Sequence, residues 1–294
     1  MTAASAQVIA ATDATATYTE VDGDRIDITG GQHASDQANL FHSFKEFDLA
    51  AEQTANFITT ANVQNVIGRI NSQQASTIDG TLQVTGSNAD LYLVNPAGIL
   101  LGPNSHLNLP GGFTATTATH LGFDDSQLTP ATENYTELTG KPTTFYFDGS
   151  APGSIVNQGD LSVQAGESIQ LIGGTVVNEG QLTAPAGNIT LAAVDGENLV
   201  RLSQSDRLLS FEIAPLEEAA EPTSVPNQAV VPTSLGEMLT GGSAHSATHL
   251  VTTLDGTVRL VGEDYSPSDS GGQVVLSGQV SAASLSGSLP GGDI

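Results

Sequence analysis

The chain repeats the stretch Ile155-Val-Asn-Gln-Gly-Asp-Leu-Ser-Val163 as Val176-Val-Asn-Glu-Gly-Gln-Leu-Thr-Ala184, 21 residues further on. In both copies apolar and polar residues alternate, which is the period of a β-strand. A repeat this short cannot hold two packed helices, whereas short strands separated by Gly and Asn turns are typical of the coils of a parallel β-helix. The repeat therefore predicts an all-β fold whose coils stack about 4.8 Å apart around an apolar column.

Asn157 and Asn178 occupy the same place in the two copies. If the coils stack, the two side-chain amides can hydrogen-bond along the axis of the β-helix. As plain turn residues they would only tolerate left-handed backbone. Both interpretations fit the sequence. A weaker echo, Gly278-Gln-Val-Ser-Ala282, extends the pattern toward the C-terminus.

The repeat predicts that residues 1–294 form one β-helix domain, with residues 1–30 capping its first coil. Residues 116–150 and 195–266 break the pattern and are expected to leave the coil as loops or hairpins, with one short helix at Arg207–Ile213. The last residues provide no polar cap, so we expect the chain to be the N-terminal part of a longer protein.

Composition excludes several classes of partner. The chain has 32 acidic and only 7 basic residues, a net charge of −25, so binding to nucleic acid or to an anionic membrane surface is not expected. There is no cysteine, which removes disulfides, thiolate metal sites and cysteine nucleophiles. Ala4-Ser-Ala6 fits the remnant of a cleaved signal peptide.

Few residues are arranged for chemistry. His245 and His249 have metal-ligand spacing but lie in a Gly- and Ser-rich context, and the pairs Asp22 with Asp24 and Asp124 with Asp125 are more typical of solvated acids than of a catalytic dyad or a calcium site. We therefore expect no enzyme, no cofactor and no metal. A β-helix polysaccharide lyase or hydrolase remains the least favoured alternative, since the seven cations are scattered.

The N-terminal half contains more specific patterns. They are Asn39-Leu-Phe-His-Ser-Phe44, Asn62-Val-Gln-Asn-Val-Ile-Gly-Arg-Ile70, Ile78-Asp-Gly-Thr-Leu82 and Ala89-Asp-Leu-Tyr-Leu-Val-Asn-Pro-Ala-Gly-Ile99. In order and content they resemble the secretion domain of the filamentous haemagglutinin type, the TPS domain of two-partner secretion exoproteins. The resemblance is closest to the cyanobacterial members.

The resemblance implies a right-handed parallel β-helix with an N-terminal cap. It also implies recognition by a dedicated outer-membrane β-barrel transporter through periplasmic POTRA domains, with secretion to the cell surface or medium. The residues that match the family's motifs, and that we expect the transporter to recognise, are Asn39, Leu40, Phe41, His42, Phe44, Asn65, Ile67, Gly68, Arg69, Asn95, Pro96, Gly98 and Ile99. Ala97 departs from the family's Asn-Pro-Asn-Gly-Ile motif and removes one amide.

The same motifs also have a purely structural interpretation. Asn95-Pro96 with Gly98 suits a tight corner between two strands. Phe41, Phe44 and Phe47, spaced by three, fit one face of a short helix or packing against the first coil. An adhesin that binds cell-surface glycans is the second functional hypothesis, with Tyr135, Phe145 and Tyr146 as available aromatic residues. We expect a monomer.

Overall fold

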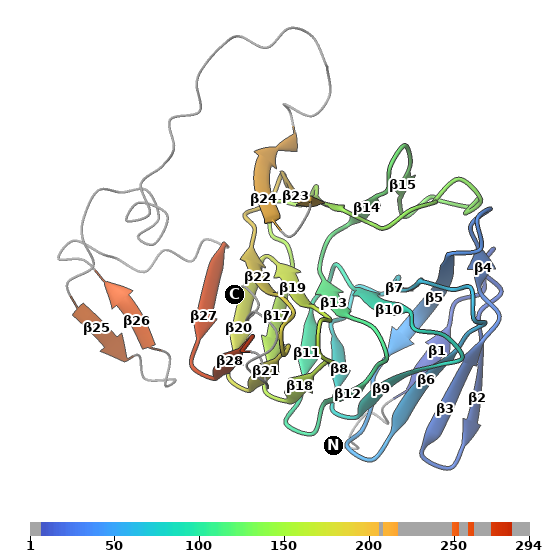
Figure 1. The fold of residues 1–294 in the computed structure, drawn as a ribbon, viewed down its shortest axis with the longest axis horizontal. Coiled ribbons are helices and arrows are strands. Elements are labelled where there is room, and N and C mark those ends of the chain that lie inside the picture. Colours follow the sequence, from blue (N-terminus) through green and yellow to red (C-terminus); the bar gives the residue numbers. More distant parts are fainter. Residues whose placement is uncertain (1–6, 206–207, 217–248, 253–257, 262–271, 284–294) are drawn as a thin grey trace, which may run out of the picture.

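The computed structural model describes residues 7–205, 208–216, 249–252, 258–261 and 272–283 (Figure 1). Its regular elements are β-strands, and no α-helix occurs among these residues. Accordingly, the described part of the chain has no helix of the length and apolarity needed to cross a membrane. The all-β class predicted from the repeat is confirmed.

Three sheets form the walls of a coil. Sheet A contains β1 (Val8–Ala10), β4 (Gln32–His33), β5 (Asn39–Phe47), β7 (Asn65–Ile70), β10 (Asp90–Val94), β13 (Phe113–Thr116), β19 (Ile169–Gly173) and β22 (Ile189–Ala193). Sheet B contains β2 (Tyr18–Asp22), β3 (Arg25–Thr29), β6 (Thr54–Ile58), β9 (Thr81–Thr85), β12 (His106–Asn108), β18 (Asp160–Ser162), β21 (Gln181–Thr183) and β28 (Gln279–Ser281). Sheet C contains β8 (Ser76–Ile78), β11 (Ile99–Leu101), β17 (Ser154–Asn157), β20 (Thr175–Asn178) and β27 (Gln273–Leu276).

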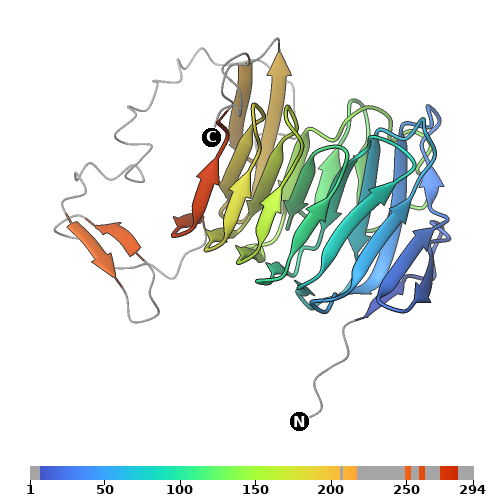
Figure 2. The same ribbon diagram turned by 60° about the horizontal axis from the view of Figure 1, so that its bottom comes forward.

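From β7 onward the chain visits sheets A, C and B in turn, and each strand pairs in parallel with its counterpart in the next coil (Figure 2). The predicted repeat is confirmed in register, because Ile155 pairs with Val176 and Leu161 pairs with Leu182. The echo at the C-terminus also stacks, since Gln181 pairs with Gln279. The molecule is therefore a parallel β-helix.

Alternation along each strand separates two apolar clusters. In β10, Leu91 and Leu93 point into the coil and belong to its central core, whereas Tyr92 and Val94 face outward and belong to a second cluster. All four side chains are buried. The outer face of sheet A is therefore covered by another part of the chain rather than by solvent.

The paired asparagines are stacked inside one corner of the coil. Asn157 Nδ2 donates to Asn178 Oδ1 at 2.8 Å, and both side chains are 0% exposed. Each amide also bonds to the backbone of the glycine two residues later, Gly159 or Gly180. The amide ladder is the correct interpretation of these residues.

The first coil is closed by aromatic side chains at the N-terminal end. β1 and β4 pair antiparallel with β5, and β2 forms an antiparallel hairpin with β3. A bulge at Lys45 lets both Phe44 and Phe47 point inward, where their ring centroids lie 5.0 Å apart. The helical interpretation of Phe41, Phe44 and Phe47 is wrong, because all three belong to β5.

An antiparallel sheet lies outside the coil. Sheet D contains β14 (His120–Gly122), β15 (Gln127–Leu128), β16 (Thr144–Phe147), β23 (Asn198–Ser205) and β24 (Leu208–Pro215). The helix expected at Arg207–Ile213 is wrong for residues 208–213, which lie in β24, and Arg207 is outside the described residues. β25 (His249–Thr252) and β26 (Val258–Val261) form a separate antiparallel pair.

Side chains of sheet D pack on the outer face of sheet A. Leu121, Phe145, Phe147 and Val200 belong to the second apolar cluster together with Tyr92. Phe145 pairs with Val200 across the β16–β23 ladder, so the two side chains share one face. A second core, outside the coil, therefore fixes sheet D in place.

Glycine at position 180 is required by the stacking of the corners. A Cβ there would overlap the carbonyl oxygen of Gly159 in the preceding coil, whereas a Cβ at Gly149 would meet no atom within 4 Å. We expect Gly180→Ala to lower the free energy of unfolding by about 1–3 kcal/mol, since the coils must separate locally. Gly149→Ala should change it by less than about 0.5 kcal/mol. Denaturant titration of both variants checks this, and equal stabilities would contradict it.

Candidate functional site

The segments that carry the family's motifs lie side by side as β5, β7 and β10 of sheet A. Their registers align the motif positions in rows: Phe41 pairs with Ile67, and Ile67 pairs with Tyr92. A second row joins Asn39, Asn65 and Asp90. Both rows face outward, so strands of different coils build one continuous surface.

The inward-facing motif residues belong to the core of the coil. Leu40 and Phe44 are at most 2% exposed, and Ile99 occupies the same core from β11. A Cβ at Gly68 would lie 3.4 Å from the ring of Phe44, which is an ordinary van der Waals contact, so the packing there does not by itself require glycine. These residues act in the folded chain as packing groups.

His42 is buried beside the closing aromatic cluster. Its ring centroid lies 5.6 Å from that of Phe57 and 6.3 Å from that of Phe44. Its Nδ1 lies 3.4 Å from the hydroxyl of Thr17, and its Nε2 has no hydrogen-bond partner. Burial lowers the pKa of His42 to about 4, and the neighbouring His33 adds to the effect. The imidazole is therefore neutral at pH 7.

The outward-facing amides form a short chain of hydrogen bonds. Asn65 Nδ2 donates to Asn39 Oδ1 at 2.7 Å. Asn39 Nδ2 in turn donates to the main-chain carbonyls of Leu138 and Gly140, both at 2.7 Å. Asn39 is 0% exposed, so these bonds lie in a protected environment where breaking them leaves polar groups unpaired.

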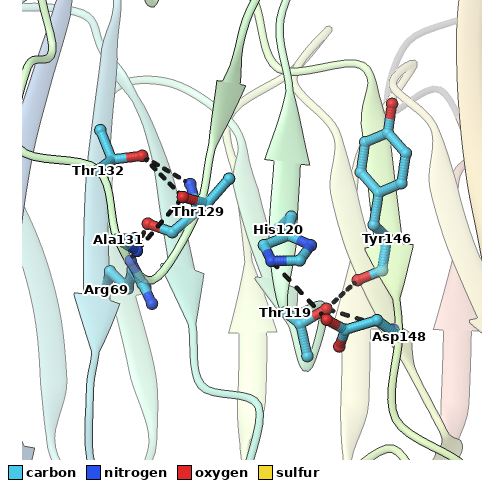
Figure 3. Close-up of polar contacts among 8 residues, drawn as sticks. All are labelled: Arg69, Thr119, His120, Thr129, Ala131, Thr132, Tyr146 and Asp148. Carbon is cyan, nitrogen blue, oxygen red and sulfur yellow. Dashed lines mark hydrogen bonds and ion pairs between the residues drawn. The ribbon is translucent and has the colours of Figure 1, made fainter.

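Phe41 and Arg69 contact the same excursion, residues 116–150. The ring of Phe41 lies 5.2 Å from Tyr135 and 5.9 Å from Phe123. Arg69 Nη1 donates to the carbonyl of Thr129 at 2.6 Å, as Figure 3 shows, while its Nε is buried without a partner. Burial lowers the pKa of Arg69 from its ordinary value, yet the guanidinium stays charged.

Polar contacts also connect residues 119–120 of this excursion with residues 146–148. Thr119 donates to the carbonyl of Tyr146 through both its N–H, at 2.8 Å, and its hydroxyl, at 2.9 Å (Figure 3). His120 Nε2 lies 3.8 Å from a carboxylate oxygen of Asp148, and its ring meets Tyr146 edge-on. These contacts tie β14 to the end of β16.

The stretch Asn95–Ile99 makes a corner between sheets A and C. Asn95 Nδ2 donates to Gln74 O at 3.1 Å and to Ser76 Oγ at 3.0 Å, while its Oδ1 accepts the N–H of Ala97 at 3.0 Å. Gly98 has a φ of 127°, which favours glycine. Asn95 and Gly98 are buried and Pro96 is partly exposed.

Sequence reasoning missed the partners of the motif residues. Thr129, Leu138 and Gly140 contribute carbonyl oxygens, which every residue type has, so no pattern in the sequence marks them. The sequence indicates Tyr135 only as a candidate for binding sugars. The aromatic and apolar content of residues 116–150 was the one available signal that this excursion packs on something.

Within the described residues, the side chains with other possible chemistry do not form a site. Tyr135 and Phe145 are 8% and 0% exposed, which leaves Tyr146 as the only accessible one of the three aromatic residues considered for sugar binding. The described residues contain no group of three or more acidic, histidine or cysteine side chains that could hold a metal ion. Asp124 and Asp125 are exposed, and His245 lies outside the described residues.

A small polar hollow opens on the outer face of sheet A. Asp90, Lys141 and Glu167 line it, and its volume of about 40 Å³ has room for water but not for a sugar. Lys141 Nζ lies 2.7 Å from Asp90 and neutralises it. Burial raises the pKa of Glu167, with Asp90 adding to the shift.

Burial of neutral His42 predicts a loss of stability in acid. The unfolded chain binds this proton near the ordinary pKa of 6.5 and the folded chain near 4, so stability is full above pH 6.5 and falls as the pH drops through that window. The contribution is about 3 kcal/mol. We expect His42→Gln to flatten the fall in unfolding free energy between pH 6.5 and 4, whereas His106→Gln, at an exposed position, keeps it. Identical pH profiles for both variants would contradict the assignment.

The solved structures that are similar to the chain include two secretion domains. One is the HMW1 secretion domain from Haemophilus influenzae, with 26% identity and a TM-score of 0.49, covering 70% of this chain and 47% of that one. The other is the filamentous hemagglutinin secretion domain, with 16% identity and a TM-score of 0.41, covering 69% of this chain and 67% of that one. The chain thus spans about half the length of the HMW1 secretion-domain chain. No curated protein sequence matches it.

A family model matches the whole motif-bearing region. The model of the TPS secretion domain matches residues 6–220, which include all the motif segments, sheet A and sheet D. This is more than half of the chain. The chain belongs to the TPS secretion domain family.

Proposed function

We propose that the chain is the secretion-signal domain of a two-partner secretion exoprotein, read by a cognate outer-membrane β-barrel transporter through periplasmic POTRA domains. In this proposal the chain enters the periplasm behind a signal peptide that is then removed, and it acts as a monomer without enzymatic activity. The proposal treats residues 1–294 as one domain, with residues 1–30 as its cap and residues 116–150 and 195–266 as excursions. The cyanobacterial subtype stays a prediction.

One observation carries the proposal: the motif residues are inside the folded molecule. Of the thirteen expected recognition residues, only Arg69 and Pro96 are partly exposed, and the others are buried. A receptor cannot read a buried side chain, so recognition of these residues requires a chain that has not completed its fold. A signal that exists only before folding suits a protein that crosses a membrane unfolded.

Composition and fold support the transit step. The net charge of −25 without cysteine lets an extended chain stay soluble and escape oxidation into disulfides. Each coil templates the next through parallel pairing, as β10 does for β13. Folding that begins at the N-terminal coils outside the cell would therefore draw the chain outward without a nucleotide.

The first test concerns dependence on the transporter. Residues 1–294, preceded by a signal peptide, are expressed in cells with and without the cognate transporter. We expect release into the medium only with the transporter, because the outer membrane offers no other route. The measurement is the amount of chain in the medium against that in the periplasm. Equal release from both strains would overturn the proposed function.

The second test separates recognition from stability at the Asn95 corner. Asn157 is a matched control, since it is equally buried and its Oδ1 likewise accepts an N–H two residues on. We expect Asn95→Ala and Asn157→Ala to lower the unfolding free energy similarly, by about 1–3 kcal/mol, because each leaves buried polar groups unpaired. We expect only Asn95→Ala to slow transporter-dependent release strongly. Equal effects of both variants on release would make Asn95 a purely structural residue.

A further inference from the structure

The polar groups around the motif bind main-chain carbonyl oxygens. The segment that supplies these acceptors is residues 129–140, here called the cover. Asn39 donates to two carbonyls of the cover, at Leu138 and Gly140, and Arg69 donates to a third at Thr129. The backbone N–H of Ser35 donates to a fourth, at Thr136. These contacts recognise the main chain of a segment that turns at residues 130–131 and 136–137, and they carry little information about which side chains it bears.

The cover makes few other contacts. It contains no strand, and Ala131, Glu133, Asn134 and several of its other residues are exposed. Its buried anchors are Tyr135, which packs against Phe41, and Leu138, which is 2% exposed. An irregular segment held by two side chains and a few carbonyl contacts belongs to the least stable part of a structure.

The surface beneath the cover, here called the docking face, consists of Asn39, Phe41, Ile67 and Arg69 on β5 and β7. The cover follows much later in the chain, since Arg69 and Thr129 are 60 residues apart and Asn39 and Leu138 are 99 apart. In a chain that folds from its N-terminus, β5, β7 and β10 can pair while the docking face is still open. The cover also leaves Arg69 Nε buried without a partner, so the docking face has one N–H donor that the cover does not satisfy.

We propose that the cover is a displaceable substitute for a segment of the transporter, whose main-chain carbonyls and apolar side chains occupy the docking face while the chain is partly folded. This rests on the proposed function. Arrival of the cover then replaces the intermolecular contacts with intramolecular ones of the same kind and releases the chain. The coincidence of the docking face with the family's motif residues singles out the transporter as the occupant.

The test uses the full chain with a weakened cover. In Tyr135→Ala with Leu138→Ala both anchors are removed, while every residue of the docking face is kept. The probe is a fluorescent peptide of residues 127–141, measured by anisotropy. We expect it to bind this variant on the order of tenfold more tightly than wild type, and adding Arg69→Met to lose that gain. Tyr135→Ala alone serves if the double variant fails to fold.

Two controls fix the interpretation. Asn157→Ala is destabilised away from the docking face and should gain no peptide binding. The periplasmic part of the cognate transporter should displace the bound peptide. If the folded cover variants do not bind the peptide, or if the periplasmic part fails to displace it, the proposal is overturned. Transporter-dependent release would still stand in that case, whereas loss of that dependence would overturn the proposed function itself.

Discussion

Parallel stacking in register is the constraint on which the whole molecule depends. Each side chain of a coil lies on the side chain at the same place in the next coil, as Leu161 lies on Leu182. Inward positions are therefore mostly apolar, with the neutral His42 as an exception, and at the Asn157–Gly159 corner an amide and a glycine stack on their counterparts in the next coil. The Asn157–Asn178 ladder and the close approach of Gly180 to Gly159 are two results of this one rule.

The same register also organises the outer face of sheet A. Because Phe41, Ile67 and Tyr92 are aligned across three strands, motifs that lie about 25 residues apart in the sequence become one surface. That surface is apolar, and it is closed by sheet D and by residues 129–140. The described parts of the excursions that pack on sheet A thus belong to a second core, and a coil lacking them would expose a large apolar patch.

The sequence allowed the repeated part of the fold to be predicted because strand period and turn residues are local signals. The strands at residues 155–163 and 176–184 and their stacking are confirmed. Local signals misled at Phe41, Phe44 and Phe47, because Phe41 faces outward from β5 and a bulge at Lys45 brings Phe44 and Phe47 to the same inward face. The helix expected near residue 210 is a strand because its pairing with β23, which depends on contacts beyond the local sequence, outweighs propensity.

The motif residues could be found from the sequence, but their surroundings could not. Asn39 and Arg69 bind carbonyl oxygens, which have no sequence signature, and they do so across separations of 60 to 101 residues. In the proposed function these residues have two roles that conflict in time. While they stay open they can be read by a receptor, and once they are satisfied by their own chain they hold the second core together. In the proposed function one set of contacts serves both roles, so completing the fold would also end recognition.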